Sequence, residues 1–350
     1  MTQKQPIDPQ SQALLYDRSN WGVLEISGAD RLRFLHNQST NDIQSLKPGQ
    51  GCDTVFVTST ARTIDLATAY LTEEAILVLI SANRRQPLVE WLDQYIFPMD
   101  QVSVKDVTQD YGVFNLIGSN SEEVLKKQGA DLTDEFVGQP AHHQPLNHRL
   151  FSLKDMTVRI ATGSGLAVPG YTLILQADAV PQLWQSLVTQ GAVPIDHSTW
   201  EQLRIQQGRP TPDFELTEDY NPLEAGLWHT ISFDKGCYIG QETIARLNTY
   251  GSAKQRLFGI RLSKAVEPGT VITLEGQKIG VLTSYTLLTE ELIPEKSTED
   301  QSEQYFSEQY FSKHLGLGYI RTKAGGAGLK VQVGDAIGEV VEIPFVSHQS

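Results

Sequence analysis

Hydrophobic and polar positions follow two different patterns along the first part of the chain. Segments with alternating apolar residues, typical of half-buried strands, are interleaved with segments whose apolar residues recur every three or four positions, typical of amphipathic helices. Strands are expected at 21–26, 54–58, 66–71, 75–80, 113–117, 158–161 and 171–176. Helices are expected after Gly28 and at 87–95, 121–127 and 180–189. This order predicts an α+β fold with two ferredoxin-like units, residues 14–101 and 102–195.

The pattern changes twice in the second part of the chain. Residues 198–207 predict one more helix, and the long irregular stretch 208–236 is typical of a functional loop, so 196–252 is expected to pack back on the first two units. From residue 258 onward, short apolar strands separated by glycines predict a small β-barrel over 253–350. The barrel is interrupted at 289–313 by a segment with seven acids, two bases and EQYFS twice in tandem. We expect a solvated insertion there, with a partner-binding tag as the alternative.

Composition narrows the class of protein. The chain has 350 residues, 40% of them hydrophobic, which is enough for several buried cores. Its net charge of −14 repels a phosphate backbone, so direct nucleic-acid binding is not expected. Two cysteines exclude a disulfide scaffold, and no apolar run is long enough for a membrane helix. The polar N-terminus lacks the apolar core of a secretory signal, so we expect a cytoplasmic protein that does not bind membranes.

The residues most indicative of chemistry form the octapeptide KGCYIGQE at 235–242. Cys237 lies two residues after Lys235 and just before an expected helix, and both the lysine and the helix dipole favour a thiolate. Cys237 and Lys235 are therefore the candidate catalytic residues. A small buried cysteine in a turn is the alternative. Arg246, together with Lys254, is a candidate for an anion pocket.

This octapeptide resembles the signature of the YgfZ family, the folate-binding relatives of the glycine-cleavage T-protein, an aminomethyltransferase. The segment FLHNQSTND at 34–42 resembles the N-terminal motif of that family. The helix end at 203–210 and the segment NPLEAGL at 221–227 are similar to two further family motifs. The resemblance implies that the two α/β units and the barrel form a ring around a central hole that holds a tetrahydrofolate. It also implies a role in assembling or repairing iron–sulfur enzymes, with only an indirect effect on tRNA thiolation.

The resemblance also assigns residues to the site. The signature loop comprises the two catalytic candidates and Gly236, Tyr238, Gly240, Gln241, Glu242 and Arg246. The folate is expected to contact Asn41, Asp65, Gln206 and Trp228. Two of these positions differ from the T-protein, where a glutamate stands at the position of Gln206 and a paired aspartate segment at that of Asp65. An amide accepts with only one oxygen, so Gln206 is a poorer partner for the N–H groups of a pterin.

Three functions follow from these observations. The first is a tetrahydrofolate-binding accessory protein whose activated cysteine serves iron–sulfur client or assembly proteins. The second is an aminomethyltransferase of glycine cleavage, against which Gln206 and the single acid at Asp65 argue. The third is a protein-binding scaffold that acts without folate. No metal site is expected, because His142, His143 and His148 have no acid or cysteine among them to complete a ligand set. Cys52 is expected in a core.

Overall fold

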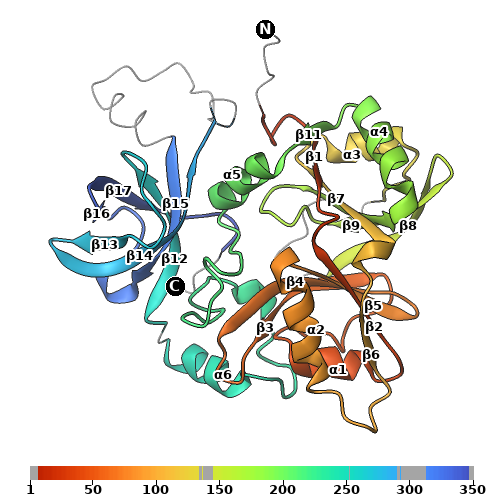
Figure 1. Ribbon diagram of the computed structural model, residues 1–350, viewed down its shortest axis with the longest axis horizontal. Coiled ribbons are helices and arrows are strands. Elements are labelled where there is room, and N and C mark those ends of the chain that lie inside the picture. Colours follow the sequence, from red (N-terminus) through yellow and green to blue (C-terminus); the bar gives the residue numbers. More distant parts are fainter. Residues whose placement is uncertain are drawn as a thin grey trace.

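The computed structural model describes residues 7–133, 136, 145–251, 253–289, 292 and 313–346. Its largest element is an eleven-stranded sheet in the order β11-β1-β7-β10-β9-β8-β3-β4-β5-β2-β6 (Figure 1). One half contains β2 (Gly22–Ser27), β3 (Gln50–Val57), β4 (Thr63–Leu71), β5 (Ala75–Ile80) and β6 (Ser103–Asp106). The other contains β1 (Leu14–Asp17), β7 (Tyr111–Ile117), β8 (Leu146–Leu153), β9 (Met156–Thr162), β10 (Gly170–Gln176) and β11 (Val193–Ile195).

The two halves of the sheet meet at a seam. β3 and β8 join them through the pairs Gln50↔Asn147 and Gly51↔Leu146. β1, which the sequence places at the start of the first unit, pairs instead with β7 and β11 of the second half. The first strand in the sequence therefore belongs to the second half of the sheet, and the strands that follow it, β2 to β6, form the first half. Because β1 is buried between two strands that follow it much later, no local pattern reveals its partners.

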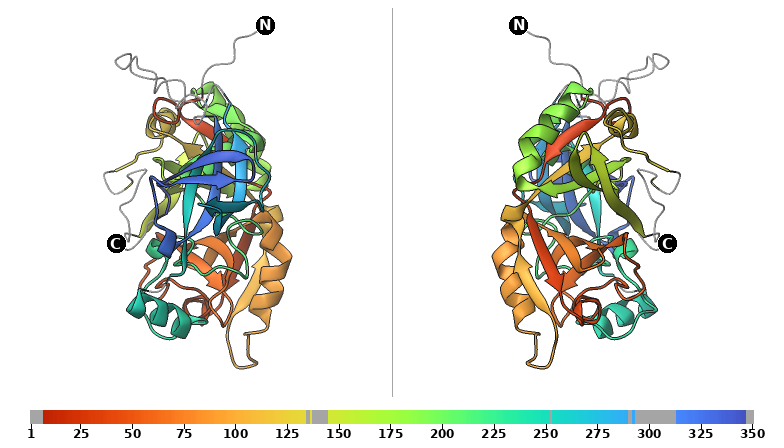
Figure 2. Two further views of the ribbon diagram at one scale, coloured as in Figure 1. Left: turned by 90° about the vertical axis from the view of Figure 1, so that its left-hand side faces the viewer. Right: turned by 90° about the vertical axis from the view of Figure 1, so that its right-hand side faces the viewer.

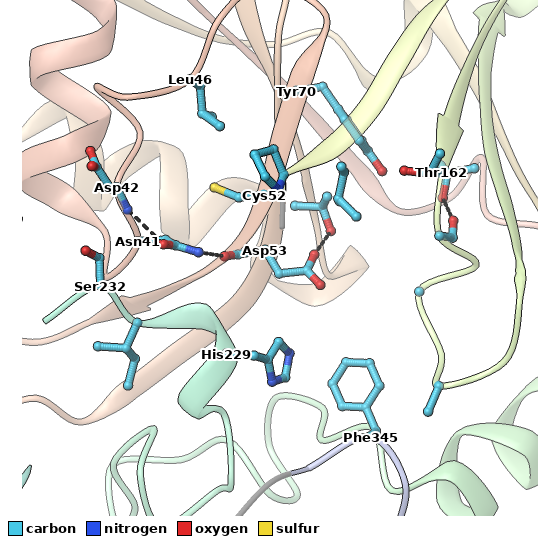
Figure 3. A pocket seen from close by; sticks show the side chains of 18 of the residues that line it. Asn41, Asp42, Leu46, Cys52, Asp53, Tyr70, Thr162, His229, Ser232 and Phe345 are labelled. Atoms are coloured by element: carbon cyan, nitrogen blue, oxygen red, sulfur yellow. Dashed lines mark hydrogen bonds between the residues drawn. The ribbon is translucent and has the colours of Figure 1, made fainter. Parts of the chain in front are cut away.

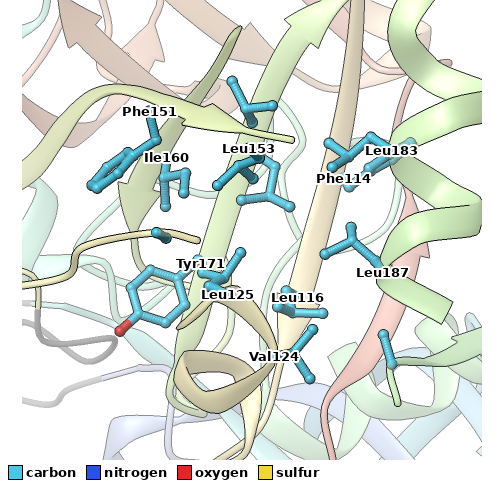
Figure 4. Packing of buried hydrophobic residues seen from close by; sticks show 14 of the residues in the cluster. Phe114, Leu116, Val124, Leu125, Phe151, Leu153, Ile160, Tyr171, Leu183 and Leu187 are labelled. Carbon is cyan, nitrogen blue, oxygen red and sulfur yellow. The ribbon is translucent and has the colours of Figure 1, made fainter. Parts of the chain in front are cut away.

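Among the described residues, six α-helices accompany the sheet, and some of them bury its apolar residues. They are α1 (Arg31–Gln38), α2 (Arg85–Asp93), α3 (Ser121–Lys127), α4 (Val180–Thr189), α5 (His197–Gln207) and α6 (Gln241–Tyr250). Figure 2 shows α2 and α4 along the same side of the molecule. On α4, Leu183 and Leu187 are one turn apart and fully buried against Phe114 of β7 and Leu173 of β10 (Figure 4). Burial of each such leucine contributes about 2 kcal/mol.

A closed barrel forms the C-terminal part, in the order β12-β15-β14-β13-β16-β17. Its strands are β12 (Gln255–Leu262), β13 (Val271–Leu274), β14 (Gln277–Leu287), β15 (His314–Arg321), β16 (Lys330–Val333) and β17 (Ala336–Val341). The glycines between the apolar residues allow close backbone approach, since a Cβ on Gly318 would lie 2.8 Å from the carbonyl oxygen of Val281. The α+β class with a small C-terminal barrel, expected from the sequence, is confirmed. Most of the acidic insertion 289–313 lies outside the described residues.

The barrel is attached to the first half of the sheet by an apolar cluster. Val55 and Leu66 of the sheet pack in one cluster with Leu317 and Tyr319 of the barrel and with Phe345, which follows it. This packing fixes the segment after β17 against the seam between the sheet halves. In the part of the chain that the structure describes, no helix combines the length and apolarity needed to cross a membrane.

Candidate functional site

A cavity of about 810 Å³ lies where the two sheet halves meet the segment after the barrel. Its walls come from β3 and β4, from the loop after α1, from the loop 163–168, from residues 229–234 and from Pro344 and Phe345. Figure 3 shows Asp42 and Ser232 on one side, Tyr70 and Thr162 on the other, and Cys52 and Asp53 between them. A volume of this size is typical of pockets for small molecules and cofactors. All three parts of the fold therefore contribute to one site.

Asp53 places a carboxylate on the wall of this cavity. The hydroxyl of Thr68, on the neighbouring strand β4, donates to Oδ1 of Asp53 at 2.6 Å. The side-chain nitrogen of Asn41 donates to the backbone oxygen of Asp53 at 2.7 Å. These two contacts fix the side chain of Asp53 and this part of β3. The other lone pairs of the carboxylate remain available to accept hydrogen bonds from a ligand. Neither the motifs nor the resemblance distinguishes Asp53 from an ordinary strand residue.

Cys52 precedes Asp53 on β3 and also lines the cavity. Burial, reinforced by the neighbouring Asp53 carboxylate, raises the pKa of the Cys52 thiol far above its usual range. This side chain is therefore a neutral thiol that contributes apolar surface. Cys52 packs against the apolar core of the first sheet half, as expected, and also contributes to the cavity wall.

The guanidinium-bearing residue Arg18 also lines the cavity. Only 3% of Arg18 is exposed, and its Nη1 donates to Oδ1 of Asn115 at 2.9 Å. The guanidinium carbon lies 3.7 Å from the ring centre of Trp21. Burial, and then the nearby charge of Arg209, lowers the pKa of Arg18 to about 9. Arg18 lies outside every motif that the sequence analysis singled out.

Lys235 ties the signature loop to the end of α1. Its Nζ donates to the backbone oxygens of His36, Ser39 and Asn41 at 2.6, 2.8 and 2.6 Å. Burial lowers the pKa of Lys235 to about 7. Within the described chain, Lys235 and Cys237 form no hydrogen bond or ion pair with each other. Lys235 therefore connects the signature loop to the segment that resembles the N-terminal family motif.

The rest of the signature loop forms a turn that places the start of α6 beside the connection between β3 and β4. Gly240 has φ +82°, and a Cβ there would lie 2.8 Å from the backbone oxygen of Thr58, so glycine is required by both conformation and space. Tyr238 is buried with Ile244. The exposed residues of this region are Gly236, Cys237, Glu242 and Arg246, and Gln241 is the partly buried first residue of α6. None of the residues of 235–242, nor Arg246, lines the cavity.

Of the four residues expected to contact folate, the structure places Asn41 on the cavity wall. Asp65 is fully buried on β4, where its carboxylate accepts from the backbone nitrogen and hydroxyl of Ser81 at 2.8 and 2.7 Å. Burial raises the pKa of Asp65 to about 6, although these two hydrogen bonds oppose the shift. Gln206 on α5 and Trp228 of the short helix η4 (Trp228–Thr230) are absent from the cavity wall. Trp228 lies beside it, with its ring 5.9 Å from that of the lining residue Phe233.

The histidine cluster is represented among the described residues by His148, since His142 and His143 lie outside them. His148 is buried, with Nε2 3.1 Å from the backbone oxygen of Gln50 and Nδ1 2.9 Å from Nη1 of Arg159. Burial, followed by the charge of Arg159, lowers its pKa to about 4. Over the described ranges, no group of three or more histidine, cysteine or acidic side chains is arranged to hold a metal ion.

Comparisons of this chain with known proteins agree on one family. The model of the GCVT N-terminal domain matches residues 9–235. An Arabidopsis thaliana protein named "Putative transferase At1g60990, chloroplastic" is 42% identical over 337 residues, which cover 96% of this chain and 72% of that protein. An aminomethyltransferase of Halalkalibacterium halodurans is 27% identical over 283 residues, 79% of this chain and 75% of the enzyme. The crystal structure of aminomethyltransferase T from Bartonella henselae matches with a TM-score of 0.75 at 19% identity, over 97% of this chain and 88% of that one, which shows a common fold.

Proposed function

Because the chain belongs to the GCVT N-terminal domain family, we propose that its cavity binds a reduced folate and that it acts as a YgfZ-like accessory protein for iron–sulfur enzymes. The observation that carries the folate proposal is the 810 Å³ cavity with the carboxylate of Asp53 fixed on its wall. A pterin presents adjacent N–H donors, and a carboxylate can accept from two of them at once. Asp53 is the cavity carboxylate best supported for this contact, because Gln206 is an amide and Asp65 is turned to Ser81.

The folate proposal is tested by calorimetry with tetrahydrofolate. We expect binding by the unaltered chain and about tenfold weaker binding by Asp53→Asn, since one charge-assisted hydrogen bond is worth about 1.5 kcal/mol or more. Gln206→Ala serves as the comparison, because its side chain does not line the cavity. An equal loss in both variants would reject the role of Asp53. If the unaltered chain showed no binding at high micromolar ligand, the folate proposal would fall and the folate-independent scaffold would be favoured.

The accessory role is supported by the position of Cys237. Its thiol is exposed and lies three residues after Asp234, the last residue of that segment on the cavity wall. A thiol at this position is accessible to a protein partner rather than enclosed with the folate. One thiolate cannot hold a cluster alone, so the client or assembly protein would supply the other ligands. The proposal includes a reducing, cytoplasm-like compartment, which agrees with two free cysteines.

The accessory role predicts a separation of effects in Cys237→Ser. We expect unchanged melting temperature and tetrahydrofolate affinity, together with loss of support for the activity of an iron–sulfur enzyme assayed in cells that lack the protein. Thr249→Ala, on an exposed position of α6, is the control and should retain full support. Full support by Cys237→Ser would reject the role of the thiol.

An aminomethyltransferase activity is the second candidate, favoured by the names of the bacterial relatives. Such a transfer needs a placed acid or base, and Asp53 is the acid that the cavity holds in the most fixed orientation. The test is to mix the protein with tetrahydrofolate and a lipoyl carrier protein loaded with the aminomethyl group. Formation of methylene-tetrahydrofolate that is lost in Asp53→Asn would establish the activity, and its absence with active carrier would exclude it.

A further inference from the structure

We propose that the guanidinium of Arg18 is the receptor for a carboxylate of the ligand in this cavity, an inference that rests on the folate binding proposed above. Arg18 is a buried cation on the wall of a cavity, and the residues around it leave part of its hydrogen-bonding capacity unused. A folate provides a fitting anion, because its glutamate tail carries two carboxylates beyond the neutral ring.

The first observation is the set of contacts that Arg18 makes. Nη1 donates to Asn115, but Nε is buried and has no hydrogen-bond partner among the described residues. In the same part of the chain, no carboxylate forms an ion pair with Arg18. Nη2 has no acceptor among these residues either, so both nitrogens of this edge are unpaired, and Nη2 is the one that is not enclosed. That edge of a guanidinium can donate two parallel hydrogen bonds to the two oxygens of one carboxylate.

The second observation is the charge around Arg18. Arg209 is also buried, with 4% exposed, and its Nη1 donates to the neutral backbone oxygen of Gly165 at 2.9 Å. Two guanidinium groups therefore share this region without a contacting acid for Arg18. Keeping an unpaired charge away from water costs several kcal/mol, and a bound anion would offset that cost. The Asp53 carboxylate raises the pKa of Arg18 without forming an ion pair with it, so Asp53 offsets part of this cost and a bound anion would offset more.

The third observation is how the charges are distributed over the cavity. Asn115 links Arg18 to the side formed by β10, since Nδ2 of Asn115 donates to the hydroxyl of Thr172 at 3.0 Å. Asp42 lies on the other side, and Asp53 lies between the two sides (Figure 3). A ligand with N–H donors at one end and a carboxylate at the other would be oriented by this distribution. The carboxylate end would face Arg18, away from Asp42 and Asp234.

Space beside the guanidinium is provided by a glycine. A Cβ built on Gly165 would lie 3.2 Å from Nη1 of Arg18, and Gly165 has φ +76°. A side chain at this position would crowd the guanidinium and strain the loop 163–168. The cavity wall is therefore shaped around the arginine. By contrast Arg246, the anion-binding candidate from the sequence, is exposed on α6 and does not line the cavity.

The test compares two ligands on the full chain by calorimetry: tetrahydrofolate, and tetrahydrofolate with both tail carboxyls converted to amides. We expect Arg18→Gln to lower tetrahydrofolate affinity 10- to 100-fold and to leave the affinity for the diamide within twofold. Arg246→Gln should leave both affinities within twofold. Arg18→Lys keeps the charge without the planar pair of donors, so its loss for tetrahydrofolate should be intermediate.

Each other outcome overturns the inference in a distinguishable way. If Arg18→Gln weakens both ligands equally, the arginine supports the ring or the cavity wall and not a carboxylate. If Arg18→Gln weakens the binding of neither ligand, Arg18 makes no contact with them. If Arg18→Gln does not fold, Arg18→Lys and the unaltered chain decide, since the unaltered chain must bind the diamide at least tenfold more weakly than tetrahydrofolate. Failure of the unaltered chain to bind either ligand overturns the proposed function together with this inference.

Discussion

Lys235→Met is expected to separate two segments that are 199 residues apart in the chain. Nζ of Lys235 donates to three backbone oxygens at the end of α1, and the substitution removes these donors while it keeps most of the aliphatic stem. The carbonyl groups of His36, Ser39 and Asn41 would then lose their partner in a region closed by the signature loop. Both the loop and the end of α1 should become less stable.

The magnitude follows from two opposing contributions. Hydrogen bonds from a charged donor contribute about 1.5–3 kcal/mol each, so three contribute about 4.5–9 kcal/mol. Burial opposes them, since lowering the pKa of Lys235 from 10.5 to about 7 corresponds to about 5 kcal/mol against the ammonium. The difference leaves a net contribution between roughly 0 and 4 kcal/mol. We therefore expect Lys235→Met to lower the free energy of unfolding by about 2 kcal/mol at pH 7.

The dependence on pH provides a sharper assay than the value at one pH. The pKa of Lys235 is lowered in the folded state, so between pH 7 and 10.5 the unfolded chain binds the proton more tightly than the folded chain. Stability must then rise with pH in this window, by up to about 1.4 kcal/mol per pH unit, and Lys235→Met must lack this component. Urea unfolding of both proteins from pH 6 to pH 9 measures the difference.

Lys47→Met, at an exposed lysine in the loop after α1, is the control and should follow the unaltered chain throughout. Parallel curves for the unaltered chain and Lys235→Met would show that burial does not lower this pKa. A Lys235→Met variant as stable as the control at every pH would refute the bracing role itself.

Three further predictions concern other buried groups. Glu215 is fully buried and accepts hydrogen bonds from Arg204, Thr283 and Ser284. Glu215→Gln should therefore lower the free energy of unfolding by about 3–5 kcal/mol, measured by thermal unfolding. The control is Glu201→Gln, at the partly exposed second partner of Arg204, which should lower it by less than about 1 kcal/mol. The pKa of Asp65 is raised from 3.8 to about 6, so its stabilising contribution is complete below about pH 3.8 and is lost as pH rises through about 6. The free energy of unfolding should therefore decline between about pH 4 and 6, and Asp65→Asn should remove this decline. Thr68→Val should weaken tetrahydrofolate binding by about threefold to tenfold in calorimetry, because Asp53 loses the hydroxyl that orients it, and unchanged affinity would contradict that role.

The barrel and the amphipathic helices could be predicted from the sequence because their patterns are local. On α4 the spacing of Leu183 and Leu187 identifies the buried face without knowledge of what covers it. β1, β6 and β11 were not expected, because strands of three or four residues are too short to show a period. β8 was not expected either, because its buried residues His148 and Phe151 are three positions apart and so do not show the alternation of a strand.

The candidate site was less predictable than the fold, for a physical reason. A motif marks residues with an unusual local requirement, and Gly240 has one, since its conformation excludes other residues. Asp53 and Arg18 have no such local requirement. They become a carboxylate and a cation on one cavity wall only through the pairing of β3 with β4 and the packing of the segment after β1. Without the strand order, neither residue differs from many others of its type.

Lys235 and Asn41 connect the two recognisable motifs to each other. The backbone oxygen of Asn41 accepts from Lys235, while its side chain donates to the backbone of Asp53 on the cavity wall. The segment that shapes the cavity and the loop that carries Cys237 are therefore connected through two consecutive hydrogen-bonded residues. A ligand held by Asp53 would stabilise the same junction that positions the exposed thiol. The proposed folate binding and the proposed role of Cys237 would therefore be coupled through this junction without sharing atoms.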